Sequence, residues 1–159
     1  MPLIGLSILL MFSEPLRAQC DFDVVHDKFD GHVTVMSKNK RLNGDSFIRA
    51  GMMISQGDTT FLISVSTSRD KIGCVVEDKS TGYFRLTSGQ VLECIHMGKT
   101  DCDEFVTMAF IVTDDIKEFL KFNVTDIRLV GGSYRRDIEM KHPDYVRESI
   151  QCLKTAKIQ

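Results

Sequence analysis

The last third of the chain, from Phe105 to Leu153, carries the pattern that most constrains the fold. Residues 105–112 (FVTMAFIV) are apolar at almost every position, and a strand with apolar side chains on both faces is normally buried on both. The segment therefore predicts a central strand. Thr113 is a good helix cap, and the apolar spacing that follows predicts a short helix near 114–121.

A β-hairpin and a closing helix are predicted for the rest of this segment. Residues 124–130 and 134–141 alternate apolar and polar side chains on either side of Gly131-Gly132, a dipeptide that suits a turn. Such alternation is typical of a sheet with one face in water. Residues 143–156 predict an amphipathic helix, and because so short a helix needs tertiary packing, we expect it to dock on the sheet.

The preceding part of the chain resembles a series of short strands separated by turn residues, the pattern of a β-rich fold. Candidate strands lie at 22–29, 32–36, 46–54, 60–65, 72–76, 83–86 and 91–97. Asp30-Gly31 is predicted to be a two-residue hairpin turn, and the basic cluster around Lys40 a solvated loop. Because so many strands would curl in one flat sheet, we predict an α+β fold of mostly antiparallel sheet, as a curled sandwich or partly open barrel.

The beginning of the chain is typical of an export signal. Residues 3–12 (LIGLSILLMF) form an apolar run that is too short to cross a bilayer but suits a signal peptide, and Ala18 is a small residue near a cleavage point. No Lys or Arg precedes the run, so either the true start lies upstream or the terminal amine supplies the charge. We predict a signal peptide over 1–19 and one domain over 20–159, without a membrane span, in the periplasm, at the cell surface or outside the cell. The residues before Cys20 fit a lipidation motif poorly.

Charge and motifs exclude several classes of function. The chain has 20 Lys and Arg against 22 Asp and Glu, a net charge of −2, and no clustered basic face to attract nucleic acid. No hydrolase, zinc-protease, phosphate-loop, dinucleotide or Cys-x-x-Cys motif is present in the sequence. We therefore expect no cofactor and no nucleic-acid partner.

Five cysteines in an exported chain predict disulfides. The favoured bridge joins Cys20 to Cys152 and would tie the first strand to the last helix, although spacing alone does not determine connectivity. Cys74, Cys94 and Cys102 remain. If Gly98–Asp101 is a four-residue hairpin loop, Cys94 and Cys102 are not directly opposed, and at least one of the three is expected to be a small buried side chain.

The densest group of reactive side chains lies at 94–104 (CIHMGKTDCDE). Cys94, His96, Cys102 and Asp103 are the candidate metal ligands, since zinc takes about four such groups in a tetrahedron. Cys94 and His96 share a strand face and could also form a thiol–imidazole pair. The spacing matches no established zinc motif, and the alternative interpretation is an ordinary hairpin.

A leader ending in Ala-Gln-Cys, the segment FIVTDDIKEFLKFNVTDIRL and a terminal helix with Cys152-Leu153 together resemble a group of small exported bacterial proteins of unknown function. The resemblance covers mainly Phe110 to Leu153. It implies export and a β-rich domain closed by a helix, and it implies no catalytic or binding residues.

Three functions remain open from the sequence. The first is a non-enzymatic binding or interaction module for an unknown protein or small-molecule ligand. The second is a metal- or thiol-dependent activity centred on 94–104. The third is a small-ligand carrier, because a curled sheet can enclose a cavity. Four methionines are candidates to line such a cavity: Met52, Met53, Met97 and Met108.

Overall fold

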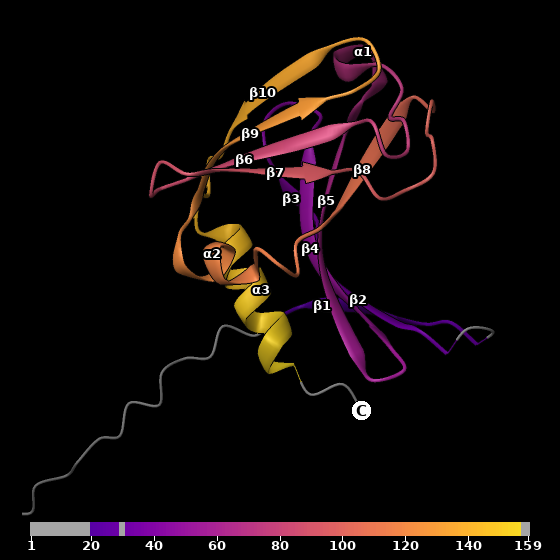
Figure 1. The fold of residues 1–159 in the computed structure, drawn as a ribbon, viewed down its shortest axis with the longest axis vertical. Helices are drawn as coiled ribbons and strands as arrows, with labels where there is room; N and C mark the ends of the chain where they lie inside the picture. Colours follow the sequence, from indigo (N-terminus) through magenta and orange to yellow (C-terminus); the bar gives the residue numbers. More distant parts are fainter. Residues whose placement is uncertain (1–19, 29–30, 157–159) are drawn as a thin grey trace, which may run out of the picture.

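A computed structural model describes residues 20–28 and 31–156 and shows two antiparallel sheets (Figure 1). The predicted leader, residues 1–19, lies outside the described residues. The first sheet has the strand order β1-β2-β4-β5-β8, with β3 also paired to β4, and the second has the order β10-β9-β6-β7. This architecture confirms the predicted α+β fold of mostly antiparallel sheet, as a sandwich rather than a closed barrel.

The strands and helices have the following bounds. The six-stranded sheet contains β1 (Phe22–His26), β2 (Val33–Ser37), β3 (Lys40–Arg41), β4 (Phe47–Ser55), β5 (Asp58–Ser68) and β8 (Phe105–Ile111). The four-stranded sheet contains β6 (Thr81–Leu86), β7 (Val91–Ile95), β9 (Val124–Val130) and β10 (Arg135–Glu139). The helices are α1 (Arg69–Ile72), α2 (Ile116–Lys121) and α3 (Tyr145–Thr155). The helices predicted near 114–121 and 143–156 are therefore present.

The core lies between the sheets and under the helices. The ring of Phe84 on β6 meets Phe110 on β8 edge to face at 5.5 Å and Phe119 on α2 at 5.6 Å, so three elements share one aromatic cluster. Gly82 lies directly over the Phe110 ring, where a Cβ atom would clash. In Figure 1 the four-stranded sheet crosses one half of the six-stranded sheet, and α3 packs against β4 and β2 over the other half.

Helix α3 is held in place by a polar contact and a disulfide as well as by its buried stripe. The Tyr145 hydroxyl donates to the carbonyl of Lys38 over 2.7 Å and accepts from the Ser37 hydroxyl over 2.8 Å. The disulfide between Cys20 and Cys152 joins α3 to the residue that precedes β1 by two positions. These two contacts therefore fix the position of the helix relative to β1 and β2. Its apolar side chains alone would not specify that position.

The prediction that 105–112 is a central strand was wrong. Strand β8 ends the strand order, and Phe105 and Ile111 are 51% and 45% exposed. Val106, Met108 and Phe110 face the core, whereas the alternate side chains form part of the outer surface of the sheet. The two-sided apolar pattern thus marks a strand with an apolar exposed face.

Residues 72–76 were also predicted wrongly as a strand. Ser68 ends β5, Arg69–Ile72 form the single turn of α1, and Gly73 ends that turn with φ +75°, a value that glycine adopts without strain. Val75 then makes one isolated β-bridge, to Asp101.

Three smaller differences concern turns. His26 pairs with Val33 and the N–H of Asp27 donates to the carbonyl of His32, so the first hairpin has a wider loop than the predicted two-residue turn; Asp30 itself lies outside the described residues. Lys40 pairs with Ile48, so the predicted loop contains the short strand β3. Residues 98–101 do not form a hairpin between β7 and β8, because these strands belong to different sheets.

In the parts of the chain that the structure describes, no helix is both long enough and apolar enough to cross a membrane.

Candidate binding site on the four-stranded sheet

The two sulfur-containing candidates in 94–104 have different environments. Cys102 forms a disulfide with Cys74, so it has no thiolate to offer a metal. Cys94 is a free thiol in the core, where burial, with smaller effects from the charges of Asp115 and Glu93, raises its pKa to about 12. A thiol with so high a pKa remains protonated at neutral pH and is a poor nucleophile.

The histidine of the same group is also buried, and both of its ring nitrogens have backbone partners. The N–H of Ala109 on β8 donates to Nδ1 of His96 over 3.0 Å. Nδ1 must therefore be unprotonated, and Nε2 carries the proton that it donates to the carbonyl of Lys99 over 3.3 Å. Neither nitrogen has a lone pair available for a metal in this arrangement.

Asp101, which follows His96 by five residues, also accepts hydrogen bonds at the edge of β8. Its Oδ2 accepts from the N–H of Thr107 over 3.1 Å, and its Oδ1 accepts from the N–H of Asp103 over 3.0 Å. His96 and Asp101 thus bind two outward-facing N–H groups of β8, while Asp103 itself is exposed. In residues 20–28 and 31–156, no group of three or more His, Cys, Asp and Glu side chains is placed to hold a metal ion. The segment covers a sheet edge instead.

The four candidate methionines do not line a common cavity. Met52 and Met108 are buried in the core, Met97 is 56% exposed, and Met53 lies on the opposite face of β4 from Met52. A cavity of about 590 Å³ does lie between the ends of β4 and β5 and the end of α3, but Ala156 at its rim is followed directly by residues outside the described part. We assign it no role.

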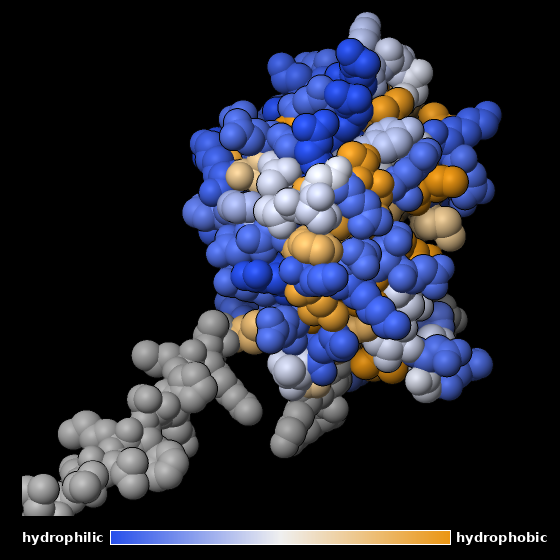
Figure 2. Space-filling model, turned by 60° about the vertical axis from the view of Figure 1, so that its left-hand side comes forward, coloured by the Kyte–Doolittle hydropathy of each residue, from blue (hydrophilic) through white to orange (hydrophobic). Residues whose placement is uncertain are grey.

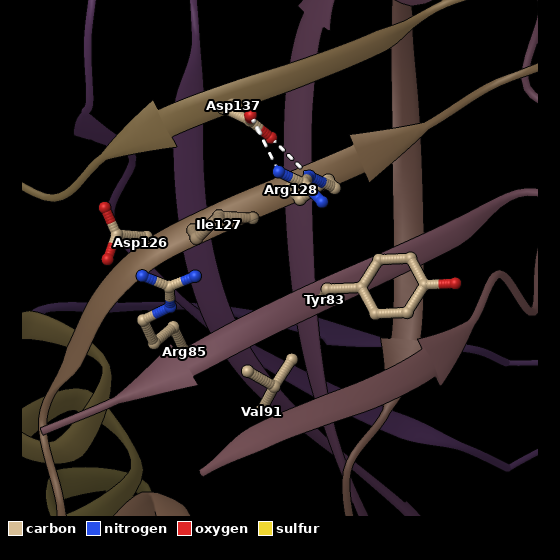
Figure 3. A pocket seen from close by; sticks show the side chains of 7 residues that line it. All are labelled: Tyr83, Arg85, Val91, Asp126, Ile127, Arg128 and Asp137. Atoms are coloured by element: carbon tan, nitrogen blue, oxygen red, sulfur yellow. Dashed lines mark hydrogen bonds and ion pairs between the residues drawn. The ribbon is translucent and has the colours of Figure 1, made fainter. Parts of the chain in front are cut away.

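A second hollow, of about 290 Å³, lies on the outer face of the four-stranded sheet (Figure 3). Strand pairing places most of its lining residues, together with Glu93 and Glu139 beside them, in two rows that cross β10, β9, β6 and β7. One row is Asp137, Arg128, Tyr83 and Glu93, and the next is Glu139, Asp126, Arg85 and Val91. No helix or second sheet covers this face in Figure 1. Figure 2 shows small orange apolar patches among blue polar side chains on the face in view.

Most charges in the first row are already paired. Arg128 donates from Nε and an Nη atom to the two carboxylate oxygens of Asp137 over 2.6 and 3.0 Å, a bidentate pair. This contact lowers the pKa of Asp137 and raises that of Arg128. The Tyr83 hydroxyl donates to Glu93 over 3.3 Å, and partial burial together with the Glu93 charge raises the pKa of the phenol.

Arg85 in the second row is different. Its guanidinium forms no ion pair within 4.0 Å with any carboxylate in the described part of the chain. Asp126 pairs with Arg85 across the strands, but its Oδ2 accepts from the Thr125 hydroxyl over 2.9 Å. Figure 3 shows the Arg85 guanidinium at the hollow, with Val91 below it and the Tyr83 ring beyond. The site therefore offers a guanidinium without a direct ion pair, which shares the hollow with the Asp126 carboxylate and with apolar and aromatic surface.

None of these lining residues was predicted as a site from the sequence. The available signal was the alternation of residues 124–130 and 134–141, which predicted a wet sheet face, but nothing local shows that Tyr83 and Arg85 lie beside that hairpin. No protein-family model, no curated protein and no solved structure matches this chain. The site is therefore interpreted from its own chemistry.

Proposed function

We propose that this protein is an exported, non-enzymatic binding module. Its ligand is a small molecule or a peptide group that carries a carboxylate or similar anion next to a flat apolar part. The observation that supports this proposal is the guanidinium of Arg85, which forms no ion pair within 4.0 Å among the described residues and lies in an open hollow on an uncovered sheet face.

The chemistry of the hollow favours an anion with this shape. A guanidinium is planar and presents parallel N–H donors that match a carboxylate, as the Arg128–Asp137 pair one row away does within the protein. The Tyr83 ring and the Val91 side chain provide surfaces against which an apolar ring can pack. Two carboxylates also line the hollow, but Asp137 is paired with Arg128 and Asp126 accepts from the Thr125 hydroxyl, so Arg85 makes the hollow less favourable for a cationic ligand.

The same residues suit binding better than catalysis. The Tyr83 hydroxyl is engaged with Glu93, and its raised pKa keeps the phenol protonated at neutral pH. Arginine is charged at all physiological pH values and does not transfer protons. The free thiol of Cys94 faces the core, on the other side of the same sheet. These features support binding without turnover.

Export is supported by the cysteines. The structure contains two disulfides, Cys20–Cys152 and Cys74–Cys102, and disulfides of this kind persist in oxidising compartments outside the cytosol. The apolar run at 3–12 has the composition of a signal peptide.

The test uses two probes of similar shape and opposite charge. Benzoate and benzamidine are titrated into the oxidised, ¹⁵N-labelled protein, and binding is followed by the shifts of the backbone amide signals. We expect benzoate to bind in the millimolar range and to shift signals of β6 and β7, and we expect benzamidine to bind much more weakly.

Two variants locate the contact. Arg85→Gln should weaken benzoate binding by about tenfold, which corresponds to about 1.4 kcal/mol. Arg135→Gln is the matched control, because Arg135 is an exposed arginine of the same sheet face that does not line the hollow. Equal affinity for the two probes, or undiminished benzoate binding by the Arg85 variant, would contradict the proposal.

A further inference from the structure

The outer face of the six-stranded sheet has a row of apolar side chains that crosses the sheet. Met36 pairs with Gly51, Gly51 with Leu62, and Leu62 with Ile111. The isolated bridge between His96 and Phe110 extends this row, because antiparallel pairing then places Ile95 of β7 beside Ile111. The row thus continues from β2 to β8, and Ile95 extends it at the corner where the outer face of the four-stranded sheet begins.

Exposed apolar side chains are concentrated on this face and at its rim. Those more than 40% exposed are Val25, Ile95, Met97, Phe105 and Ile111. Met53 and Leu62, which are half-buried, lie between them. We refer to Met36, Met53, Leu62 and Ile111, with those rim residues, as the apolar sheet face.

The two outer faces of the sandwich differ in character. The outer face of the four-stranded sheet carries several arginines and carboxylates, whereas that of the six-stranded sheet carries its apolar side chains among serines and threonines, and its ionisable residues include Asp23, Arg49 and Asp58. Exposed apolar side chains gathered on one sheet face mark a candidate interaction surface. At the centre of the face, Gly51 carries no side chain, and the Met36 thioether and the Leu62 methyl group approach it closely. Methionine side chains adapt readily to a partner surface.

We propose that the apolar sheet face is a homodimer interface, in which two copies pack their six-stranded sheets face to face with their strands antiparallel. Sheets pack in this manner in sandwich proteins at about 10 Å separation. The occupant of the face is therefore a second copy of the same chain.

The whole outer face of the six-stranded sheet is close to the smallest size that a specific dimer needs. Five strands about 4.8 Å apart, averaging roughly seven residues at about 3.3 Å per residue, present roughly 550 Å² per copy. Two copies together would bury on the order of 1,100 Å² if the face is treated as flat, and side chains that project from it add to this area. Specific interfaces begin at about 1,200 Å². The area is thus close to the lower limit for a specific association.

The charges on this face select the antiparallel arrangement. Arg49 near the start of β4 and Asp58 at the start of β5 point to the same outer face but lie at opposite ends of the β4–β5 ladder, because Asp58 pairs with Ser55 and Arg49 pairs with Ser64. Neither side chain forms an ion pair with another described residue. A two-fold axis across the strands brings Arg49 of each copy to Asp58 of the other, whereas a parallel arrangement would bring like charges together.

The first experiment measures the mass of the oxidised, exported protein by sedimentation equilibrium over a range of concentrations. We expect a monomer–dimer equilibrium with a micromolar dissociation constant. Ile111→Lys should raise that constant by about tenfold or more, since it places a charge in the apolar row. Val24→Lys is the matched control, because Val24 is 47% exposed but lies on the opposite face of β1 from Val25, and it should leave the constant unchanged.

A charge exchange separates a contact across the interface from an effect on folding. Arg49→Asp and Asp58→Arg should each weaken the dimer, and the double variant should restore it, which a folding defect cannot explain. A wild-type protein that is monomeric throughout, an Ile111→Lys variant that dimerises as well as the wild type, or a double variant that fails to recover would each overturn the proposal. A monomer that binds phosphatidylcholine vesicles would assign the face to a lipid surface instead.

Discussion

The backbone N–H of Ala109 donates to Nδ1 of His96 over 3.0 Å, and this bond explains a histidine that the sequence placed among candidate metal ligands. Strand β8 ends its sheet, and an uncovered strand edge exposes N–H and C=O groups that invite pairing with other chains. His96 and Asp101 satisfy two of these N–H groups, and the N–H of Met97 donates to the carbonyl of Ala109 over 2.9 Å. The imidazole therefore protects an edge.

Replacement of His96 by leucine should destabilise the fold. It leaves the half-buried Ala109 N–H without an acceptor, which costs about 1 to 3 kcal/mol. Urea unfolding followed by circular dichroism measures this change. His142→Leu is the control, because His142 is exposed and its change should stay within about 0.5 kcal/mol. Equal stability of the two variants would show that the His96 bond contributes nothing.

Cys94 should be unreactive in the folded protein and should make stability fall at high pH. Its thiol has a pKa of about 12 in the fold against an ordinary value of 9.0, so above pH 9 the unfolded chain loses the proton while the folded chain retains it. The contribution is complete below pH 9 and is lost as pH rises towards 12. Unfolding free energies measured across this range should fall more steeply in the wild type than in Cys94→Ala.

Mass spectrometry after alkylation tests the same residue independently. One iodoacetamide adduct per chain should form in denaturant without reductant and none under native conditions, since the other four cysteines are in disulfides. Rapid native labelling would contradict the buried position of this thiol.

The contact of Arg136 with Asp45 should hold the two sheets together. Arg136 points inward from β10, donates to Asp45 over 2.9 Å, and also donates to the Thr67 hydroxyl of β5. Because these are charge-assisted hydrogen bonds, Arg136→Met should cost about 1 to 3 kcal/mol, measured by urea unfolding. Arg135→Met, the neighbouring exposed arginine, should cost much less.

The same contact predicts an acid dependence. Its hydrogen bond to Arg136 holds the pKa of Asp45 below the ordinary 3.8. The stabilisation is therefore present above pH 3.8 and is lost as pH falls through the lower value of the folded state. Between pH 5 and pH 2, the wild type should lose more stability than Asp45→Asn, and parallel curves for the two would be evidence against this pairing.

The Cys20–Cys152 disulfide should contribute more to stability than the Cys74–Cys102 disulfide. Their cysteines are 132 and 28 residues apart, and in the loop-entropy model longer loops lose more entropy on closure, about 5 against about 3.6 kcal/mol. Thermal unfolding of the two double Cys→Ser variants tests the order. A larger loss for the shorter loop would show that native packing, rather than loop length, determines the contribution.

Local patterns were sufficient for the elements of the last third except for the position of its first strand. The alternation in 124–130 and the apolar stripe of the last helix gave β9 and α3 because one-face burial imposes a period that can be read within the segment. The same argument failed for 105–112. A strand whose second face is apolar but exposed has the same sequence pattern as a strand buried on both faces. Only the strand order shows that β8 lies at an edge.

The sequence by itself determined the fold class, most strands and two of the helices, and it favoured the Cys20–Cys152 pairing without determining it. The tertiary structure alone decided that Cys102 pairs with Cys74, that His96 meets Ala109, and that Arg85 lies beside the β9–β10 hairpin. The period of apolar residues depends on which side of a segment faces the core, so it can be read from neighbouring residues. Which strands, cysteines or side chains come together depends on contacts between residues far apart in the chain. No local pattern shows which of several competing pairings packs best.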